Sequence, residues 1–356
     1  MLKSAAPPQR VEAPTADSLS AVEQTLSAGT RVVVQLSAPP YPAPVLSQLN
    51  RLARQYGVLL EVRFYGHYGS AFDCSTLIQL RDVASLSLDC LSEVQNLEEV
   101  ASLERLTSLS LGVFELANGA ILDAPNLRRL SALTLGDTRK SVFDLAALAE
   151  YAELSLLRVC GHTKNLEALA GLHSISELWL NSIPKRVPLA FASHMRGVQS
   201  LHVYLGGRES LAEIQSPGIE TLEVVRVRGL RDLGALSRFP ALERLLVEDQ
   251  LQLEQLSFGV ENAALQIVHL YNCKSLRALA GIEAVPQLTE IQVFRTAIEP
   301  EALRRTRLPQ SLRRVAFGSG KASIDRRVRA EATRLGYDPA GNSASIIGID
   351  WRRPSG

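Results

Sequence analysis

Apolar residues recur along most of the chain in one short motif, in which an apolar residue is followed three and five positions later by two more. Twelve copies lie within residues 59–318, and equivalent positions in successive copies are 21 to 24 residues apart. Side chains alternate along a strand, so positions four and six of each copy face one side, which must be buried, and positions three, five and seven face the other. The pattern predicts twelve short strands whose fourth positions are Val62, Leu86, Leu109, Leu133, Leu157, Leu178, Leu201, Leu222, Leu245, Val268, Ile291 and Val315.

A second period, of three residues, separates several of these strands. This spacing favours short 3-10 turns over full α-helices. Each unit of strand and turn then has an apolar edge that it cannot bury alone, so we predict that the units stack into a solenoid with one continuous core. The period of three is clearest in Leu166, Leu169, Leu172 and Ile175, in Leu230, Leu233, Leu236 and Phe239, and in Leu276, Leu279, Ile282 and Val285.

The repeats resemble the leucine-rich repeat superfamily, in the irregular form of 21 to 24 residues seen in bacterial and internalin-like proteins, and residues 166–180 show this well. The resemblance implies an α/β repeat solenoid, a leucine-rich repeat horseshoe or arc with a parallel sheet on its concave face. The family usually has Asn or Cys three positions after the last strand leucine, and here only Cys273 matches. We therefore expect the fold, with less regular curvature.

Both ends of the solenoid need caps, because the first and last repeats would otherwise expose core. Residues 1–17 are rich in Ala and Pro and are predicted to be a disordered lead. Residues 18–64 are predicted to form an α/β cap that merges into the first repeat: a helix over 18–29, a strand over 31–36, a helix over 45–56 and a strand over 59–64. The solenoid of about 12 repeats covers residues 59–318. Residues 319–356 are predicted to be a basic C-terminal cap with a helix over 323–335 and a strand over 345–351.

The charge is unevenly distributed along the chain. Its net value is +1, but residues 301–356 contain 12 Lys and Arg against 5 Asp and Glu, which leaves −6 on the rest. A basic segment attracts phosphates or acidic surfaces. Four arginines of the predicted C-terminal helix lie mostly off its apolar stripe, and no aromatic residue interleaves with them, so a solvated helix face explains them better than nucleic-acid binding. These are Arg326, Arg327, Arg329 and Arg334.

Motifs of catalysis, metal binding or cofactor binding are not found in the sequence. The 4 cysteines form no CxxC pair, the 6 histidines show no paired metal spacing, and no GxSxG elbow occurs. The loop over residues 318–323 lacks the first glycine and the hydroxyl residue of a phosphate-binding loop. No apolar run is long enough to span a membrane, and the first residues lack the apolar stretch of a signal peptide. We therefore expect a cytoplasmic, non-enzymatic protein without a cofactor.

The strand positions that face away from the core define the candidate binding surface. From Ser85 to Gly136 they are small and polar, which predicts either a flat floor open to close approach or an unused surface. From residue 158 to residue 294 they mix aromatic and charged side chains, as protein interfaces do. Stacking between neighbouring strands would also explain these aromatic residues. The candidate partner-binding residues are Arg158, Glu177, Trp179, His202, Tyr204, Glu223, Arg244, Glu248, His269, Tyr271 and Phe294.

The resemblance implies a recognition scaffold, and the first hypothesis is a protein that binds another protein on its concave face, as a bacterial adaptor or a toxin-immunity protein would. An effector aimed at host proteins is a further possibility within this class. The alternative hypothesis places a ligand-binding or enzymatic site in the N-terminal α/β cap, near Tyr65, His67 and Tyr68, with the repeats positioning a substrate. The other interpretation is that these residues form the polar lip of the first repeat. A filled cap would remove the alternative site, and a cavity of roughly 300 Å³ or more lined by these residues would favour it.

Overall fold

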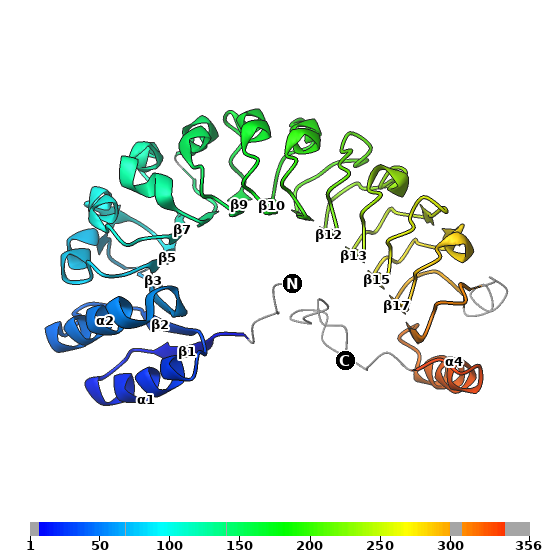
Figure 1. Ribbon diagram of the computed structural model, residues 1–356, viewed down its shortest axis with the longest axis horizontal. Helices are drawn as coiled ribbons and strands as arrows, with labels where there is room; N and C mark the ends of the chain where they lie inside the picture. The colour runs from blue at the N-terminus through cyan, green and yellow to red at the C-terminus, as the bar shows by residue number, and fades with distance from the viewer. Residues whose placement is uncertain (1–6, 68, 140, 300–307, 339–356) are drawn as a thin grey trace. The chain divides into compact units, whose positions relative to one another are not determined.

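The structure is a computed structural model that describes residues 7–67, 69–139, 141–299 and 308–338. The chain divides into two compact units, Met1–Ile175 and Ser176–Gly356, called here the first unit and the second unit. Within each unit, parallel strands line one side, and helices or short helical turns line the other (Figure 1). We call the side of the strands that points away from these turns the inner face of that unit.

The first unit contains a parallel sheet whose strands follow one another in sequence order. Adjacent strands pair in register, with Val62 beside Leu86 and Leu109 beside Leu133. The strands are β1 (Gln9–Glu12), β2 (Val32–Leu36), β3 (Leu60–Tyr65), β5 (Ser85–Leu91), β7 (Ser108–Val113), β8 (Ala132–Leu135) and β9 (Leu156–Cys160).

The second unit repeats this arrangement with a more regular register. Each pair of neighbouring strands aligns five residues with five, without a bulge. The predicted α/β leucine-rich repeat solenoid is therefore confirmed in both units. The strands of the second unit are β10 (Glu177–Asn181), β11 (Ser200–Tyr204), β12 (Thr221–Val225), β13 (Arg244–Glu248), β15 (Ile267–Tyr271), β17 (Glu290–Phe294) and β18 (Arg314–Gly318).

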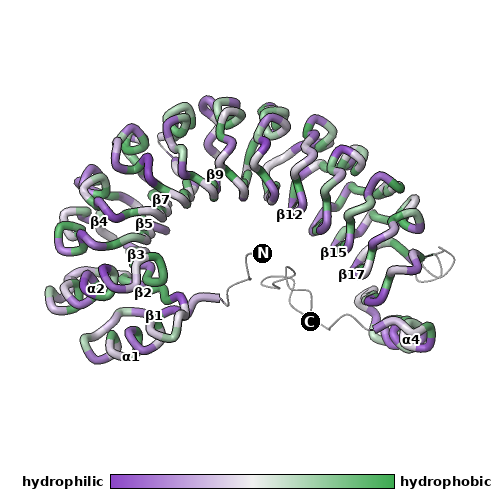
Figure 2. The backbone as a smooth tube through the Cα atoms, viewed as in Figure 1, coloured by the Kyte–Doolittle hydropathy of each residue, from purple (hydrophilic) through white to green (hydrophobic). Residues whose placement is uncertain are grey.

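The core of each unit lies between the strands and the outer turns. The fourth and sixth motif positions are buried in nearly every repeat, as predicted, and the residues at the period of three join them from the outer side. Hydrophobic and hydrophilic stretches accordingly alternate within each coil (Figure 2). Many of the turns are 3-10 helices: η1 (Gly57–Leu59), η2 (Cys74–Gln79), η3 (Leu97–Ser102), η4 (Ala120–Asp123), η5 (Pro125–Arg129), η6 (Leu145–Glu150), η7 (Leu166–Gly171), η8 (Ala190–His194), η9 (Leu236–Arg238) and η10 (Ile282–Ala284).

Some outer segments form small parallel sheets instead. The first pairs β4 (Phe72–Asp73) with β6 (Val94–Gln95). The second pairs β14 (Gln255–Ser257) with β16 (Ala278–Ala280), which occupies part of a segment whose spacing of three predicted turns alone.

Two α-helices cover the outer side of the first strands, which confirms the helices predicted in the α/β cap. Their buried residues, among them Leu19, Leu26 and Leu49, pack against one another and the sheet. The helices are α1 (Ala16–Ser27) and α2 (Ala43–Tyr56).

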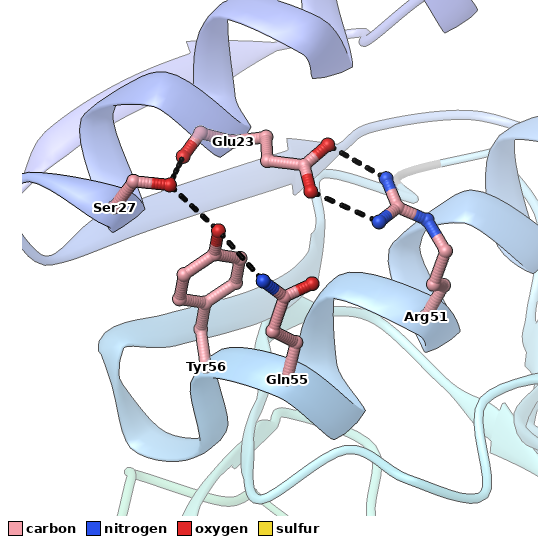
Figure 3. A network of polar contacts seen from close by, with 5 residues as sticks. All are labelled: Glu23, Ser27, Arg51, Gln55 and Tyr56. Atoms are coloured by element: carbon pink, nitrogen blue, oxygen red, sulfur yellow. Dashed lines mark hydrogen bonds and ion pairs between the residues drawn. The ribbon is translucent and has the colours of Figure 1, made fainter.

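A polar network joins the solvent sides of α1 and α2 (Figure 3). The Arg51 guanidinium donates to both carboxylate oxygens of Glu23, at 2.9 and 2.7 Å. The Tyr56 hydroxyl lies 2.7 Å from Ser27 Oγ and accepts from Gln55 Nε2 at 3.0 Å. These exposed contacts join the two helices and add little free energy of unfolding.

The predicted disordered lead is wrong for its described part. Strand β1 extends the sheet by pairing with β2 in parallel. The Ala- and Pro-rich composition of the segment therefore did not indicate the strand within it. The helix begins at Ala16 and not at Ser18, because Thr15 is the N-cap. Thr15 and Ser18 each accept the other's backbone N–H through a side-chain oxygen, at 3.2 and 2.8 Å, in a capping box.

The repeats are held in register by side chains at the position where the family usually has Asn or Cys. Gln250 Nε2 donates to the Val224 carbonyl at 3.3 Å, and Cys273 Sγ donates to the Val247 carbonyl at 3.6 Å. His162 Nε2 lies 2.7 Å from the Gly136 carbonyl oxygen. In each case the acceptor lies 26 residues earlier, in the preceding coil. A glutamine and a histidine therefore bond to the preceding coil as Cys273 does, although Gln250 and Cys273 reach the carbonyl of a sixth motif position and His162 reaches that of a seventh.

The described part of the C-terminal cap is a helix, α4 (Ala322–Arg334), as predicted. Its start is fixed by Asp325, whose Oδ1 accepts from the Ser319 backbone N–H at 2.6 Å and the Ser319 hydroxyl at 2.7 Å. The strand predicted over residues 345–351 lies outside the described residues, and so does Tyr68.

Candidate functional site

The inner face of the second unit consists of three columns of side chains that run across the strands in register. The middle column, formed by the fifth motif positions, is almost entirely buried: His202, Glu223 and His269 are 0 to 2% exposed. Side chains on an open sheet face lose this much solvent only when those on adjacent strands, about 4.8 Å apart, pack against each other. The column runs Trp179, His202, Glu223, Leu246, His269, Gln292 and Ala316.

A cluster of aromatic and acidic residues occupies the start of this face, on β10, β11 and β12. The Trp179 indole stacks on the His202 ring at 3.7 Å between centroids and 8° between planes. Its Nε1 donates to Glu177 Oε1 at 2.6 Å, and the Tyr204 hydroxyl donates to Glu223 Oε2 at 2.5 Å. His202 Nδ1 lies 2.8 Å from the same Glu223 oxygen, although the two are not aligned for a hydrogen bond. The indole and the phenol are thereby held in fixed orientations.

A second cluster, on β15, β17 and β18, is organised by one buried carboxylate. Glu290 accepts from His269 Nε2 at 2.8 Å and Gln292 Nε2 at 2.7 Å, and its other oxygen lies 2.9 Å from Arg314 Nη1. Burial opposes ionisation of Glu290, but these donors outweigh it and lower its pKa. The Tyr271 hydroxyl donates to Gln292 Oε1 at 2.6 Å, which ties the ring to the same network.

Between the two clusters lies a carboxylic acid with a perturbed pKa. Burial, with the negative charges of Asp249 and Glu223, raises the pKa of Glu248 to about 7, and Arg226 only partly opposes this. Glu248 is 7% exposed and stands beside Val225 and Tyr271 in the seventh-position column. Its charge therefore changes near neutral pH.

The structure separates the predicted partner-binding residues into exposed and buried ones. Trp179, Tyr204 and Phe294 are partly exposed, and so are Glu177 and Arg244. The other residues predicted in the second unit are 7% exposed or less, so they support the surface rather than form it. Arg158 belongs to β9 of the first unit, where it lines a different surface. The buried supports are His202, Glu223, Glu248, His269 and Tyr271.

Sequence reasoning missed Glu290, Gln292 and Leu205. Glu290 lies at a third position, which received less weight than the fifth and seventh. Leu205 follows β11 in a left-handed conformation, with φ 56°, and its side chain is 42% exposed. Such a backbone is uncommon for leucine. Leu205 could have been noticed in the sequence as an apolar residue that directly follows the strand and lies outside the buried positions of the motif.

The inner face of the first unit is hollow where the second is filled. A cavity of about 460 Å³ lies over the small polar residues that the sequence places there, between Arg63 of β3 and Arg158 of β9. The predicted flat floor is thus the floor of a cavity.

In the N-terminal cap, the structure places two residues of the alternative site, His67 and Tyr65, in different surroundings. His67 lines a cavity of about 270 Å³ together with Tyr41, and the Tyr41 hydroxyl contacts His67 Nε2. Burial lowers the pKa of His67, and a hydrogen bond to the Tyr65 backbone opposes this in part. Burial also raises the pKa of Tyr41. The Tyr65 hydroxyl instead donates to Glu12 at 2.5 Å. The two predicted residues therefore do not line one cavity.

Within the described ranges, no group of three or more His, Cys, Asp or Glu is arranged to hold a metal ion. Over the same residues, no helix has the length and apolarity needed to cross a membrane. Burial raises the pKa of the Cys74 and Cys273 thiols to about 12, so both remain protonated at neutral pH.

Comparison with known proteins finds similarity in structure and not in sequence. No family model and no curated protein matches the chain. An internalin from Listeria monocytogenes is 16% identical, with a TM-score of 0.43, over 72% of this chain and 88% of that one. A leucine-rich repeat protein from Leptospira interrogans is 15% identical, with a TM-score of 0.43, over 92% and 99%. A chain of the Toll–Spatzle complex from Drosophila is 11% identical, with a TM-score of 0.43, over 86% of this chain and 43% of that one. The leucine-rich repeat fold itself rests on the strand order and register given above.

Proposed function

We propose that the protein is a non-enzymatic scaffold that binds a protein partner on the inner face of its second unit. The observation that carries this proposal is the support beneath the exposed aromatic rings. Trp179 is fixed by the buried His202 ring and by Glu177, while Tyr204 is fixed by the buried Glu223. Aromatic anchors that are ordered before binding lose little side-chain entropy when a partner covers them.

The composition of the surface also favours a protein partner. Partly exposed aromatic side chains at both ends of the face, Trp179 and Tyr204 at one and Phe294 at the other, are accompanied by the charged groups of Glu177 and Arg244. This mixture is typical of the centre and rim of protein interfaces. Binding by an adaptor and inhibition of a toxin by an immunity protein would use the same face, and the captured partner distinguishes them.

The test compares the full chain with a double variant, Trp179→Ala with Tyr204→Ala, in affinity purification from the cells that make the protein. We expect the variant to lose a partner that the unchanged chain retains, because both ordered anchors are gone. Phe114→Ala is the matched control, since Phe114 is an aromatic residue that is 47% exposed in the first unit, outside its strands. Equal recovery of the partner by the double variant would show that the interface lies elsewhere.

Thermal unfolding of the variants separates binding from folding. Trp179→Phe provides a second check, because it keeps an aromatic ring over His202 and loses the indole N–H that donates to Glu177. We expect this variant to bind more weakly than the unchanged chain and more tightly than the alanine double variant. Isothermal titration calorimetry of each variant with the purified partner gives the affinities.

A further inference from the structure

The cavity on the inner face of the first unit has a chemistry unlike that of the aromatic face. Its residues come from strands β1 to β9 of the inner sheet, or lie directly before a strand as Pro8 and Arg31 do, and no aromatic side chain is among them. A volume of about 460 Å³ lies within the range of small-molecule sites, which is roughly 300–1,000 Å³. Most such sites are apolar, whereas the floor of this cavity is made largely of hydroxyl groups.

The hydroxyl groups of the floor have no side-chain hydrogen bond within the part of the chain that the structure describes. Ser85 and Ser87 are 2% and 4% exposed, yet neither side chain hydrogen-bonds to any described residue. Ser108, Ser110 and Thr134 on the next two strands are partly exposed and also lack a side-chain hydrogen bond among the described residues. Buried hydroxyl groups in folded proteins are almost always hydrogen-bonded. A polar ligand in the cavity would supply the missing partners for several of them together.

Arginine side chains form the walls of the same cavity. Arg63 Nη2 donates to Asp89 Oδ2 at 2.6 Å, and its guanidinium lies 4.8 Å from the centre of the Tyr65 ring, which fixes its position. Arg31 Nη2 donates to Glu61 Oε2 at 2.7 Å. Each guanidinium has five N–H donors, so one carboxylate contact leaves others for a ligand.

The charges of the lining residues favour an anion. Four arginines line the cavity against two carboxylates, those of Glu61 and Asp89. The arginines are Arg10, Arg31, Arg63 and Arg158. Because no aromatic ring is available for stacking, a nucleobase would find no platform here, and a lipid tail would meet a polar floor.

We propose that this cavity binds a small phosphate-bearing molecule, of the class of sugar phosphates or pyrophosphate. Guanidinium groups recognise phosphate oxygens with paired, charge-assisted hydrogen bonds, and serine hydroxyls donate to the remaining oxygens or accept from a sugar. The proposal goes beyond the proposed protein binding and uses the other unit of the chain. Either one therefore stands if the other fails.

The test is isothermal titration calorimetry of the full chain with inorganic pyrophosphate, glucose 6-phosphate and glucose. We expect at least one phosphate probe to bind, glucose not to bind, and the affinity to fall as salt is added, because the interaction is between charges. The double variant Ser87→Ala with Ser110→Ala should weaken binding by about tenfold or more, since each lost hydrogen bond is worth up to a factor of about ten.

Ser200→Ala is the matched control, because Ser200 occupies an inner position of β11 in the second unit and should leave phosphate binding unchanged. Arg63→Lys tests the geometry of the wall, since lysine keeps the charge and loses the paired donors. Absence of binding by both phosphate probes at millimolar concentration would overturn the proposal. It would indicate that water alone satisfies the hydroxyl groups. Equal binding by the serine double variant, or equal binding of glucose and glucose 6-phosphate, would overturn it as well.

Discussion

The two units share one strand arrangement but differ in the side chains on their inner faces. On β5 and β7 of the first unit, the middle column contains Ser87 and Ser110, and a cavity of about 460 Å³ lies above them. On β11 and β15 of the second unit, the same column contains His202 and His269, which are 0% and 2% exposed. The strands of both units are parallel, and Ser87 pairs with Ser110 in register as His202 pairs with Glu223, so the difference at this column lies in its side chains.

The comparison shows what side-chain size does on a leucine-rich repeat sheet. Rings and carboxylates on adjacent strands fill the space above the backbone and become a second packed layer, of which only a few rings reach solvent. Serine and threonine leave that space open and present their hydroxyl groups to it. Arginine side chains line its walls. One architecture thus provides a solid, aromatic face and a hollow, polar one.

The largest effect that tests this contrast is expected from Tyr271→Ala. Tyr271 is 4% exposed, packs against Leu246, and lies 5.7 Å from the Phe294 ring. Removing a buried aromatic ring costs about 3–5 kcal/mol of the free energy of unfolding, and urea denaturation measures it. Tyr271→Phe should cost only about 1 kcal/mol, because it removes just the bond to Gln292. A negligible loss for the alanine variant would mean that this face is not a packed layer.

A smaller loss of stability is expected from Glu290→Gln. This substitution removes the carboxylate charge that accepts from His269 and Gln292 and pairs with Arg314. We expect a decrease of about 1–3 kcal/mol in the free energy of unfolding. The pKa of Glu290 is lowered, so its contribution is present above the ordinary pKa and is lost as pH falls through the lowered value. Glu254→Gln is the control, because Glu254 pairs with Arg277 at the surface, where both side chains are 63% exposed, and it should change little.

Glu248→Gln should stabilise the second unit near pH 8. The folded state raises the pKa of Glu248 from 4.5 to about 7, so the folded protein retains a proton that the unfolded chain releases. Stability from this group therefore falls as pH rises between these values and is constant above them. We expect the variant to gain a few degrees in melting temperature near pH 8 and to show a flatter pH profile. Identical profiles for the two proteins would contradict the raised pKa.

The smallest effect is expected in the first unit, from Ser110→Ala and Thr134→Val. These hydroxyls have no hydrogen-bond partner among the described residues, so their removal should change the free energy of unfolding by less than about 0.5 kcal/mol. Denaturant melts in phosphate-free buffer measure it. A loss well above this value would indicate that the hydroxyls support the fold, and would weaken the contrast between the faces.

The candidate site was only partly predictable from the sequence. Inner positions such as Trp179, Tyr204 and Phe294 follow from the alternation of side chains along each strand. Their exposure does not, because it depends on neighbours 21 to 24 residues away: Tyr271 is covered, and Tyr204 is not. Phe294 and Arg158 were predicted on one surface, and the structure places them in different units.

The sequence by itself determined the repeat, the strands, the buried side of each strand and the helices of the N-terminal cap, because these follow from local periods of two, three and about 23 residues. The tertiary structure alone decided which side chains of the inner faces remain accessible and where space is left. It also decided that His162 and Gln250 serve the role expected of Cys273. The physical reason is that packing and hydrogen bonding across coils join atoms that are remote in sequence, and residue spacing does not determine whether a particular side chain reaches its neighbour.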